Sequence, residues 1–365
     1  MRSRRWSALA LASTLLATSA GSARAEESVA PPRPPTRGRR VIATAAAILP
    51  GVVVRGSGHW LVDDRRTAKR LLVIEGVGLG LAALGGLPLG ISGGAEETLP
   101  GLALLVPATG LLFTSLAADV WGAAGGAGIA GTPAPPSALD ASLGYSFVGD
   151  PRVPFANLAT VDASAWLGPA QLRASGWLGD STWQARATAG LRVYGPRPGA
   201  RRDDGDTSAL DLAVSVAEER RADQGLRIAS GEAAVLAHID LARIGPTLHG
   251  TFATIGMGFG AERVRYTASG TADTSGLMSA RIGWGFVLGD LRGTGRALET
   301  EIYYEHRRDT LAGGLTLHIP FNGFIGYVGA VTTAWHGRYG VSARLDAGSA
   351  YVATIAAHVR LPELP

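Results

Sequence analysis

The feature that most constrains the fold of this chain is an alternation of apolar and polar residues that begins near residue 137. From Thr182 to Val193, every odd position is apolar and every even position is polar or glycine. A period of two places successive side chains on opposite faces of a β-strand. Segments of this kind recur down to the C-terminus, so the sequence predicts a large antiparallel sheet with one apolar and one polar face.

The first 25 residues have the composition of a secretory signal. A basic start is followed by an apolar stretch from Ala8 to Ala17, and then by small residues that end at Ala25. This order predicts export and cleavage, and the apolar stretch is too short to span a membrane. Four of the 34 basic residues lie in residues 1–25, which leaves 30 basic residues against 30 acidic ones. The balanced remainder gives no reason to expect nucleic acid as a partner.

Residues 26–136 divide into two linkers and an apolar module. Residues 26–40 are rich in proline and arginine, which predicts an extended spacer and makes a periplasmic envelope protein a candidate partner. Residues 41–126 are dominated by Leu, Ala, Val and Gly and predict a helical module. Residues 127–136 form a Pro/Gly linker, and residues 137–365 form the predicted β domain.

Two stretches of the helical module, residues 71–91 and 99–118, are each about long enough to cross a bilayer. They predict a helical hairpin that turns within residues 92–98. The predicted helix breakers and close-packing glycines are Pro88, Pro107, Gly76, Gly80, Gly86 and Gly90.

The hairpin has two interpretations, as spans of the inner membrane or as helices associated with the β domain. Cleavage of the signal would leave the basic cluster at residues 65–70 on the periplasmic side, against the positive-inside preference. The association with the β domain is therefore favoured. Glu75, inside the first apolar stretch, is a candidate functional membrane carboxylate. The structural alternative is a hydrogen bond to Ser57, His59 or Arg70.

Residues 48–76 resemble the Pro-Gly helical hairpin of TM2-like small membrane proteins. The resemblance rests on Pro50-Gly51, on Gly56 and Gly58, and on Trp60 before a basic turn that enters an apolar helix. The chain departs from the pattern at Asp63 or Asp64, where another glycine is usual. The resemblance implies a hairpin and no functional residue.

The predicted strands number thirteen, and several have the length that a tilted membrane strand needs. Bacterial membrane barrels have even strand numbers, so twelve strands are expected, with ten or fourteen as alternatives. The least secure segments are 170–177 and the pair around Pro320. The predicted segments are 138–148, 157–167, 170–177, 182–193, 208–217, 226–241, 247–262, 277–288, 296–306, 312–319, 323–335, 339–347 and 351–361.

A closed membrane barrel is favoured over a soluble sandwich because the region is rich in Gly and Ala and has few bulky core residues. Aromatic residues near strand ends are typical of interfacial girdles. At this level residues 137–361 resemble the outer-membrane β-barrels of Gram-negative bacteria, which implies an outer-membrane location with the lipid bilayer as partner. The chain departs from that class because it ends in "HVRLPELP" without a terminal aromatic residue. The candidate girdle residues are Tyr145, Phe147, Trp166, Trp177, Tyr194, Tyr266 and Trp335.

Charged residues on the polar face are the candidate functional site. Glu299, Glu301 and Glu305 share one face of a strand, and arginines occupy the corresponding face of other strands. If this face lines a lumen, the charges form a constriction that sets solute selectivity. The structural alternative is an Arg–Glu network that fills a narrow interior. The candidate lumen charges are Arg186, Arg192, Arg281, Glu299, Glu301, Glu305 and Arg344.

No motif for a metal, a cofactor or a catalytic centre emerges from the sequence. The seven histidines have no metal-ligand spacing, and the chain has no cysteine to form thiolate sites or disulfides. The favoured function is a passive pore or a structural protein of the outer membrane, without catalysis. One alternative is an inner-membrane anchor that carries a periplasmic β-rich binding domain. The other is a barrel enzyme that acts on lipid through a Ser-His pair.

Overall fold

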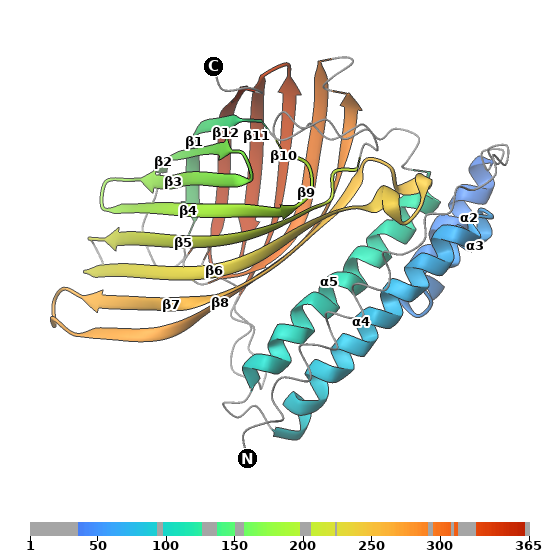
Figure 1. Ribbon diagram of the computed structural model, residues 1–365, viewed down its shortest axis with the longest axis horizontal. Coiled ribbons are helices and arrows are strands. Elements are labelled where there is room, and N and C mark those ends of the chain that lie inside the picture. Colours follow the sequence, from blue (N-terminus) through green and yellow to red (C-terminus); the bar gives the residue numbers. More distant parts are fainter. Residues whose placement is uncertain are drawn as a thin grey trace. The chain divides into compact units, whose positions relative to one another are not determined.

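The computed structural model describes two parts of the chain, an N-terminal helical module and a β domain (Figure 1). The predicted signal, most of the linker at 26–40 and the linker at 127–136 lie outside the described residues. The described residues are 36–92, 98–125, 137–149, 157–197, 206–222, 225–290, 295–307, 310–312 and 326–361.

The helical module contains the predicted hairpin, formed by two long antiparallel helices. Helix α2 begins at Arg37, so residues 37–40 belong to it and not to the expected linker. The two long helices continue past Pro88 and Pro107, which therefore do not end them, and their connection at 93–97 lies outside the described residues. The elements are α2 (Arg37–Ile48), η1 (Pro50–Val52), α3 (Ser57–Leu61), α4 (Arg65–Ser92) and α5 (Thr98–Ala123).

The two long helices approach each other at Gly78 and Gly85 and not at the predicted pair Gly76 and Gly80. A Cβ on Gly78 would lie 3.0 Å from Leu112 Cγ, and one on Gly85 would lie 2.5 Å from the Gly101 carbonyl oxygen. No atom lies within 4 Å of the corresponding position at Gly76 or Gly80. The contact therefore uses a seven-residue spacing, which returns to the same helix face after two turns.

The short segments before α4 explain the resemblance to the Pro-Gly hairpin. Gly58 packs so closely that a Cβ there would lie 2.7 Å from the Cβ atoms of Ala47 and Ala123. Asp63, one of the two positions at which that pattern usually has a glycine, has a φ of 65°. It is the only non-glycine residue with a positive φ among those described. The chain thus keeps the left-handed turn with an aspartate, one of the residues that tolerates it.

The β domain is a closed antiparallel barrel of twelve strands, as predicted. Strand β1 pairs with β12, where Leu139 lies opposite Leu361, so both ends of the barrel chain lie at one end, here called the terminal end. Strand β9 pairs directly with β10, and the predicted strand at 312–319 falls almost wholly on residues 313–325, which lie outside the described residues. The strands are β1 (Leu139–Gly149), β2 (Asn157–Leu167), β3 (Ala170–Leu178), β4 (Thr182–Tyr194), β5 (Ala209–Arg221), β6 (Leu226–Asp240), β7 (Thr251–Tyr266), β8 (Ala272–Asp290), β9 (Arg296–His306), β10 (Tyr327–His336), β11 (Tyr339–Ala347) and β12 (Tyr351–Leu361).

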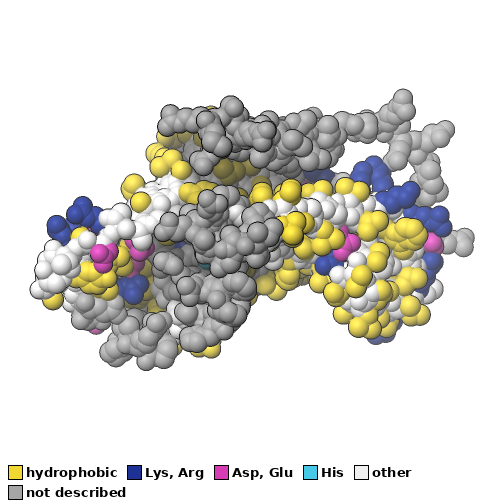
Figure 2. Space-filling model, turned by 90° about the horizontal axis from the view of Figure 1, so that it is seen from below, with side chains coloured by type: hydrophobic (Ala, Val, Ile, Leu, Met, Phe, Trp, Pro, Cys, Tyr) yellow, Lys and Arg dark blue, Asp and Glu magenta, His cyan; other side chains and the backbone are white. Residues whose placement is uncertain are grey.

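The outside of the barrel is apolar and the inside is polar, which is the reverse of a soluble protein. Outward-facing side chains such as Leu143, Val214 and Ile355 are more than half exposed. On the face in Figure 2, apolar side chains gather on the helical module and on the middle of the described wall, while the left end of the wall carries charged side chains. Trp166, Trp177 and Trp335 were expected in girdles, but Trp166 and Trp335 are buried inside the barrel and Trp177 lines its cavity. Each shares the strand face of polar lumen residues, so the face and not the strand end decides its position.

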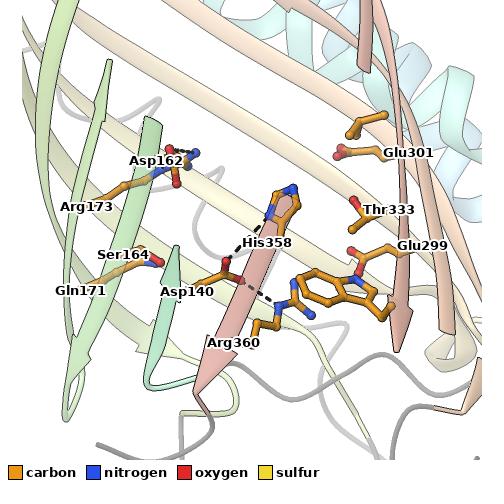
Figure 3. A pocket seen from close by; sticks show the side chains of 12 residues that line it. Asp140, Asp162, Ser164, Gln171, Arg173, Glu299, Glu301, Thr333, His358 and Arg360 are labelled. Carbon is orange, nitrogen blue, oxygen red and sulfur yellow. Dashed lines mark hydrogen bonds and ion pairs between the residues drawn. The ribbon is translucent and has the colours of Figure 1, made fainter. Parts of the chain in front are cut away.

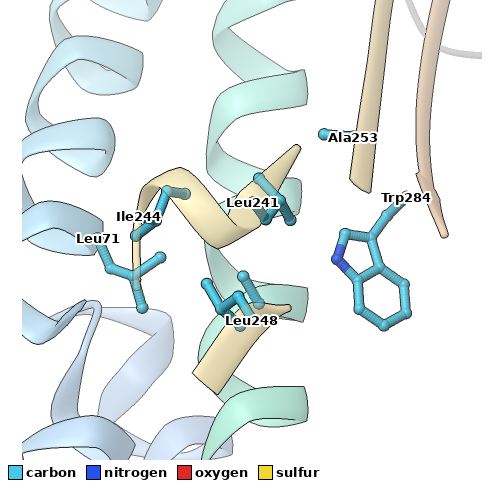
Figure 4. Packing of buried hydrophobic residues seen from close by; sticks show 7 residues of the cluster. Leu71, Leu241, Ile244, Leu248, Ala253 and Trp284 are labelled. Carbon is cyan, nitrogen blue, oxygen red and sulfur yellow. The ribbon is translucent and has the colours of Figure 1, made fainter. Parts of the chain in front are cut away.

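The helical module packs against the outer wall of the barrel. Leu71 of α4 and Ala118 of α5 meet Trp284 of β8 and the β6–β7 connection in one buried cluster (Figure 4). Trp121 stacks on Phe286 with ring centroids 4.8 Å apart. The β6–β7 connection supplies η3 (Leu241–Arg243) and η4 (Pro246–Leu248), and Arg70 donates to the Arg243 carbonyl oxygen at 2.6 Å. The helices are thus associated with the barrel, as the sequence favoured.

Candidate functional site

The lumen of the barrel brings most of the predicted charges together. All seven candidate lumen residues lie on inward-facing positions, and six of them line two cavities of about 620 Å³ and 280 Å³. Their alternation along β4, β8, β9 and β11 places them there, because the opposite face of each strand carries apolar residues. Their placement is therefore as expected, while their role stays a prediction.

Arg281 is the centre of the predicted cluster. Its guanidinium donates to Glu301 at 2.9 Å and to Glu305 at 3.1 Å, and it lies 4.1 Å from the centre of the Tyr303 ring. Thr254 also donates to Glu301 at 2.5 Å. Two of the three predicted carboxylates are thus held by one arginine, in the manner of the structural alternative.

Arg344 joins this cluster through Tyr303 and through Asp346, which the sequence did not single out. It donates to Asp346 at 2.8 Å, and the Tyr303 hydroxyl donates to the other oxygen of the same carboxylate. The Arg344 guanidinium also lies 5.4 Å from the Tyr303 ring centre. Asp346 follows Arg344 by two residues and so shares its strand face, which is the signal that could have identified it.

Arg186 reaches the same region through a second missed pair. It lies 3.9 Å from Glu232, which accepts a hydrogen bond from Arg307 at 2.5 Å. Arg307 in turn lies 3.9 Å from Glu305. Glu232 is the buried acid on the inward face of β6, a signal in the sequence, whereas Arg307 follows the end of β9 and is brought in by the fold alone.

The smaller cavity lies toward the terminal end and has an excess of acids (Figure 3). Asp140 accepts from Arg360 at 2.8 Å, and Asp162 pairs with Arg173 at 2.7 Å. Glu299 also lines this cavity, and no ion pair or hydrogen bond joins it to another described residue. The lining carries four carboxylates against two arginines, and the charged lining residues are Asp140, Asp162, Glu299, Glu301, Arg173 and Arg360.

Arg192 lies apart from this network. Its guanidinium makes a two-pronged contact with Asp211, at 2.8 Å for each hydrogen bond, and lies 4.5 Å from the ring centre of Trp166. The sequence grouped it with the other arginines because they share a strand face. The structure places it in a local pair near the terminal end of β4.

Glu75 is not part of the lumen, because it lies inside the helical module. It accepts a hydrogen bond from the Arg55 backbone amide at 3.1 Å, and the Arg55 guanidinium nitrogen Nε lies 4.0 Å from its other oxygen. Arg55, which the sequence did not suggest, is therefore a partner of Glu75. A second buried pair lies nearby, where His59 Nδ1 is 2.7 Å from Asp119 Oδ1 and neither side chain is exposed to solvent.

The described residues contain no group of three or more His, Cys, Asp or Glu side chains placed to hold a metal ion. The polar groups of the described lumen are mainly arginines, carboxylates and hydroxyls that bond to one another, together with His358, Gln171 and Gln184. Such a lining can attract or repel a passing ion, and its paired charges also keep the wall in place.

No family model matches this sequence, and no curated protein matches it. Solved structures similar to the chain include the translocator domain of autotransporter NalP from Neisseria meningitidis, at 14% identity and a TM-score of 0.36, over 63% of this chain and 91% of that one. The NanC porin is similar at 11% identity and a TM-score of 0.37, over 62% of this chain and all of that one. The KdgM porin is similar at 5% identity and a TM-score of 0.36, over 60% and 99%. The closed antiparallel barrel of this chain agrees with the predicted resemblance to the outer-membrane class.

Proposed function

We propose that this protein is an outer-membrane pore for small hydrophilic solutes and that its lumen favours cations. The observation that carries the proposal is the polar lumen, with a cavity of about 620 Å³ inside a wall whose outer face is apolar. A water-soluble periplasmic β domain would instead present its polar face to solvent. The exposed Leu143, Val214 and Ile355 are placed to meet lipid.

The preference for cations rests on the unequal pairing of the lumen charges. Arg281, Arg307 and Arg344 each contact a carboxylate, so their charges are largely balanced locally. Glu299 has no such partner among the described residues and lines the cavity with the acid excess. An unbalanced carboxylate in a narrow polar passage raises the local concentration of cations.

The first test locates the protein and its pore. The full chain is expected in the outer-membrane fraction, with a gel mobility that changes on boiling, because a closed barrel resists unfolding by detergent. In planar bilayers it is expected to conduct ions. In a salt gradient, its reversal potential is expected to have the sign of a pore that conducts cations better than anions. A folded, heat-modifiable barrel without conductance would make it a structural envelope protein instead.

The Glu299→Gln variant tests the source of the preference. It is expected to reduce the cation preference while leaving the heat-dependent mobility unchanged. Asp211→Asn is the matched control, because Asp211 is paired locally with Arg192 outside the two cavities. Equal shifts in both variants would contradict a special role for Glu299.

A second candidate function, ester hydrolysis, follows from three residues of the lumen wall. Ser342 Oγ lies 2.7 Å from His358 Nε2, and His358 Nδ1 lies 4.0 Å from Asp140 Oδ1. In a hydrolase of this kind, serine attacks the ester carbonyl as histidine takes the hydroxyl proton and passes it to the leaving alcohol, which leaves an acyl-serine. A water molecule, deprotonated by the same histidine, then attacks the acyl-serine, and the histidine returns the proton to the serine oxygen as the carboxylic acid is released. The backbone amides beside Ser342 are engaged in the strand ladder, so an oxyanion site would have to come from side chains.

Reaction with a fluorophosphonate probe separates the two functions. If the protein is a pore alone, neither the native chain nor the Ser342→Ala variant takes up the probe, and both conduct. Labelling of the native chain and loss of labelling in Ser342→Ala would favour the hydrolase.

A further inference from the structure

Helix α4 presents an apolar face that the rest of the protein leaves uncovered. Arg65–Leu87 is long and apolar enough to cross a membrane, yet only 22% of its most apolar window is buried. Its buried positions form one stripe toward α5, at Leu71, Glu75, Gly78 and Gly85. A continuous apolar surface of this kind marks contact with lipid or with another protein. The exposed apolar side chains are Leu72, Val73, Val77, Leu79, Leu84 and Leu87.

The single charge in this stretch is internally satisfied. Glu75 is buried and faces Arg55, which offers it both a backbone amide and a guanidinium. The Arg55 guanidinium also donates to carbonyl oxygens of Gly51 and Leu112. The exposed face of α4 between residues 71 and 87 therefore carries no charge, and the buried pair does not oppose transfer of that face into hydrocarbon.

The hairpin follows the barrel wall away from the terminal end. Arg70 bonds to the β6–β7 connection at the terminal end, and Trp121 meets Phe286 near the end of β8. Farther along both elements, a Cβ on Gly110 would lie 3.0 Å from Ile282 Cγ1. In Figure 1 the two helices point in a direction that is intermediate between the direction of strands β4–β8 and the direction of strands β9–β12. Strands on opposite walls tilt to opposite sides of the barrel axis, so the hairpin runs broadly along that axis.

The length and the charges of α4 suit a bilayer crossing. Twenty-three helical residues extend about 35 Å, against a hydrocarbon core of about 30 Å. The helix begins with Arg65, Arg66, Lys69 and Arg70, so its basic end lies at the terminal end of the barrel. Long basic side chains at one end of an apolar helix are typical of the boundary between lipid and water.

We infer that the α4–α5 hairpin is a transmembrane element in the same bilayer as the barrel, with lipid acyl chains covering the exposed face of α4. The inference rests on the proposed membrane location of the barrel. Acyl chains fit better than a partner protein because the uncovered face offers no charged group to orient a partner. It also joins an apolar wall that includes the exposed Phe259 of β7 and Ile302 of β9. The hairpin thus packs inside the membrane against the outer wall of the barrel, at β7 and β8.

The natural absence of cysteine permits a direct test with single-cysteine variants of the full chain. Leu79→Cys probes α4, Ile355→Cys probes the lipid-facing barrel wall, and Asp63→Cys probes a position open to water. In outer membranes, a charged maleimide is expected to label Leu79→Cys and Ile355→Cys about tenfold more slowly than Asp63→Cys, because hydrocarbon excludes the reagent. After reconstitution, brominated phospholipid is expected to quench a fluorophore at Leu79→Cys as strongly as one at Ile355→Cys.

The other possible results distinguish a failure of the inference about the hairpin from a failure of the proposed membrane barrel. Rapid labelling of Leu79→Cys together with slow labelling of Ile355→Cys would show that the hairpin lies outside the membrane while the barrel lies within it. Rapid labelling of both would overturn the proposed membrane barrel as well. Slow labelling of Leu79→Cys without quenching by lipid would show that protein covers α4, and it would overturn the inference.

Discussion

The barrel and the helical module have similar apolar exteriors, but their charged pairs differ in access to water. The barrel turns its polar face inward, so pairs such as Arg281 with Glu301 line cavities that can hold water. The helical module has no lumen, and His59 and Asp119 are shut off from solvent completely. A charged pair beside water can be rehydrated when one partner is removed, whereas a pair in a dry helix contact cannot. Charged pairs should therefore influence ion conduction in the barrel lumen and stabilise the packing of the helical module.

The largest expected effect comes from removing the acid of the dry pair. Asp119 accepts hydrogen bonds from the backbone amides of Gly56 and His59 and contacts the His59 ring. Asp119→Ala is expected to lower the unfolding free energy of the helical module by about 2–4 kcal/mol, since each buried donor left unpaired costs about 1–3 kcal/mol. Hydrogen exchange of α3 and α5 peptides in detergent measures the loss.

The matched control removes an acid from the barrel lumen. Asp162 is partly exposed and pairs with Arg173, so Asp162→Ala is expected to cost no more than about 1 kcal/mol. A comparable loss of protection in both variants would break the distinction between dry and wet pairs.

A smaller effect is expected from the close contact between the two helices. A valine at position 85 would meet the Gly101 carbonyl oxygen, so Gly85→Val is expected to destabilise the hairpin by about 1–3 kcal/mol. Gly80→Val is the matched control, because nothing lies within 4 Å of its Cβ position. Hydrogen exchange across α4 and α5 distinguishes the variants. If Gly80→Val proved the more harmful, the helices would meet at the spacing that the sequence first suggested.

The two regions also differ in how much their sequences reveal. A period of two assigns each barrel residue to one of two faces, so the inward positions of Glu299, Glu301 and Glu305 were predictable. Trp166 was misassigned because its place near a strand end was weighed above its shared face with Asp162 and Ser164. Thirteen segments alternate like strands, and their alternation does not reveal that β9 pairs directly with β10.

The helical module gave weaker signals because it is apolar nearly all round. Such a helix has no polar face to indicate which side is buried. Glycine spacing therefore favoured Gly76 with Gly80, whereas Gly78 and Gly85 make the contact. The partner of Glu75 was equally hidden, because Arg55 reaches it across a turn that no local pattern specifies.

A substitution at Arg281 tests how the charged pairs of the lumen affect ion selectivity. Arg281→Gln removes the cation that balances Glu301 and Glu305. It is expected to raise the cation-to-anion permeability ratio two- to fivefold, which corresponds to about 0.4–1 kcal/mol. Reversal potentials in a salt gradient measure the ratio, and Glu299→Gln is expected to move it the other way. A shift toward anions in Arg281→Gln would mean that its carboxylate partners do not face the conducting path.

The smallest expected effect lies in the ion pair between Asp206 and Arg243, two loop residues of the β domain beside its contact with the helical module. Burial acts to raise the pKa of Asp206, but hydrogen bonds from Arg243 and Ser208 outweigh it and lower that pKa below its usual 3.8. The unfolded chain therefore takes up the proton first as the pH falls, so the pair stabilises the fold above that value and loses its effect as the pH falls through the lowered one. Because Arg243 is half exposed, the contribution is expected to be roughly 0.2–0.5 kcal/mol. Thermal midpoints in detergent should place Asp206→Asn slightly below the native chain at about pH 6. The difference is expected to shrink as the pH falls below 3.8 and through the lowered pKa of Asp206. A difference that grew in acid would mean that the carboxyl group is held in its neutral form.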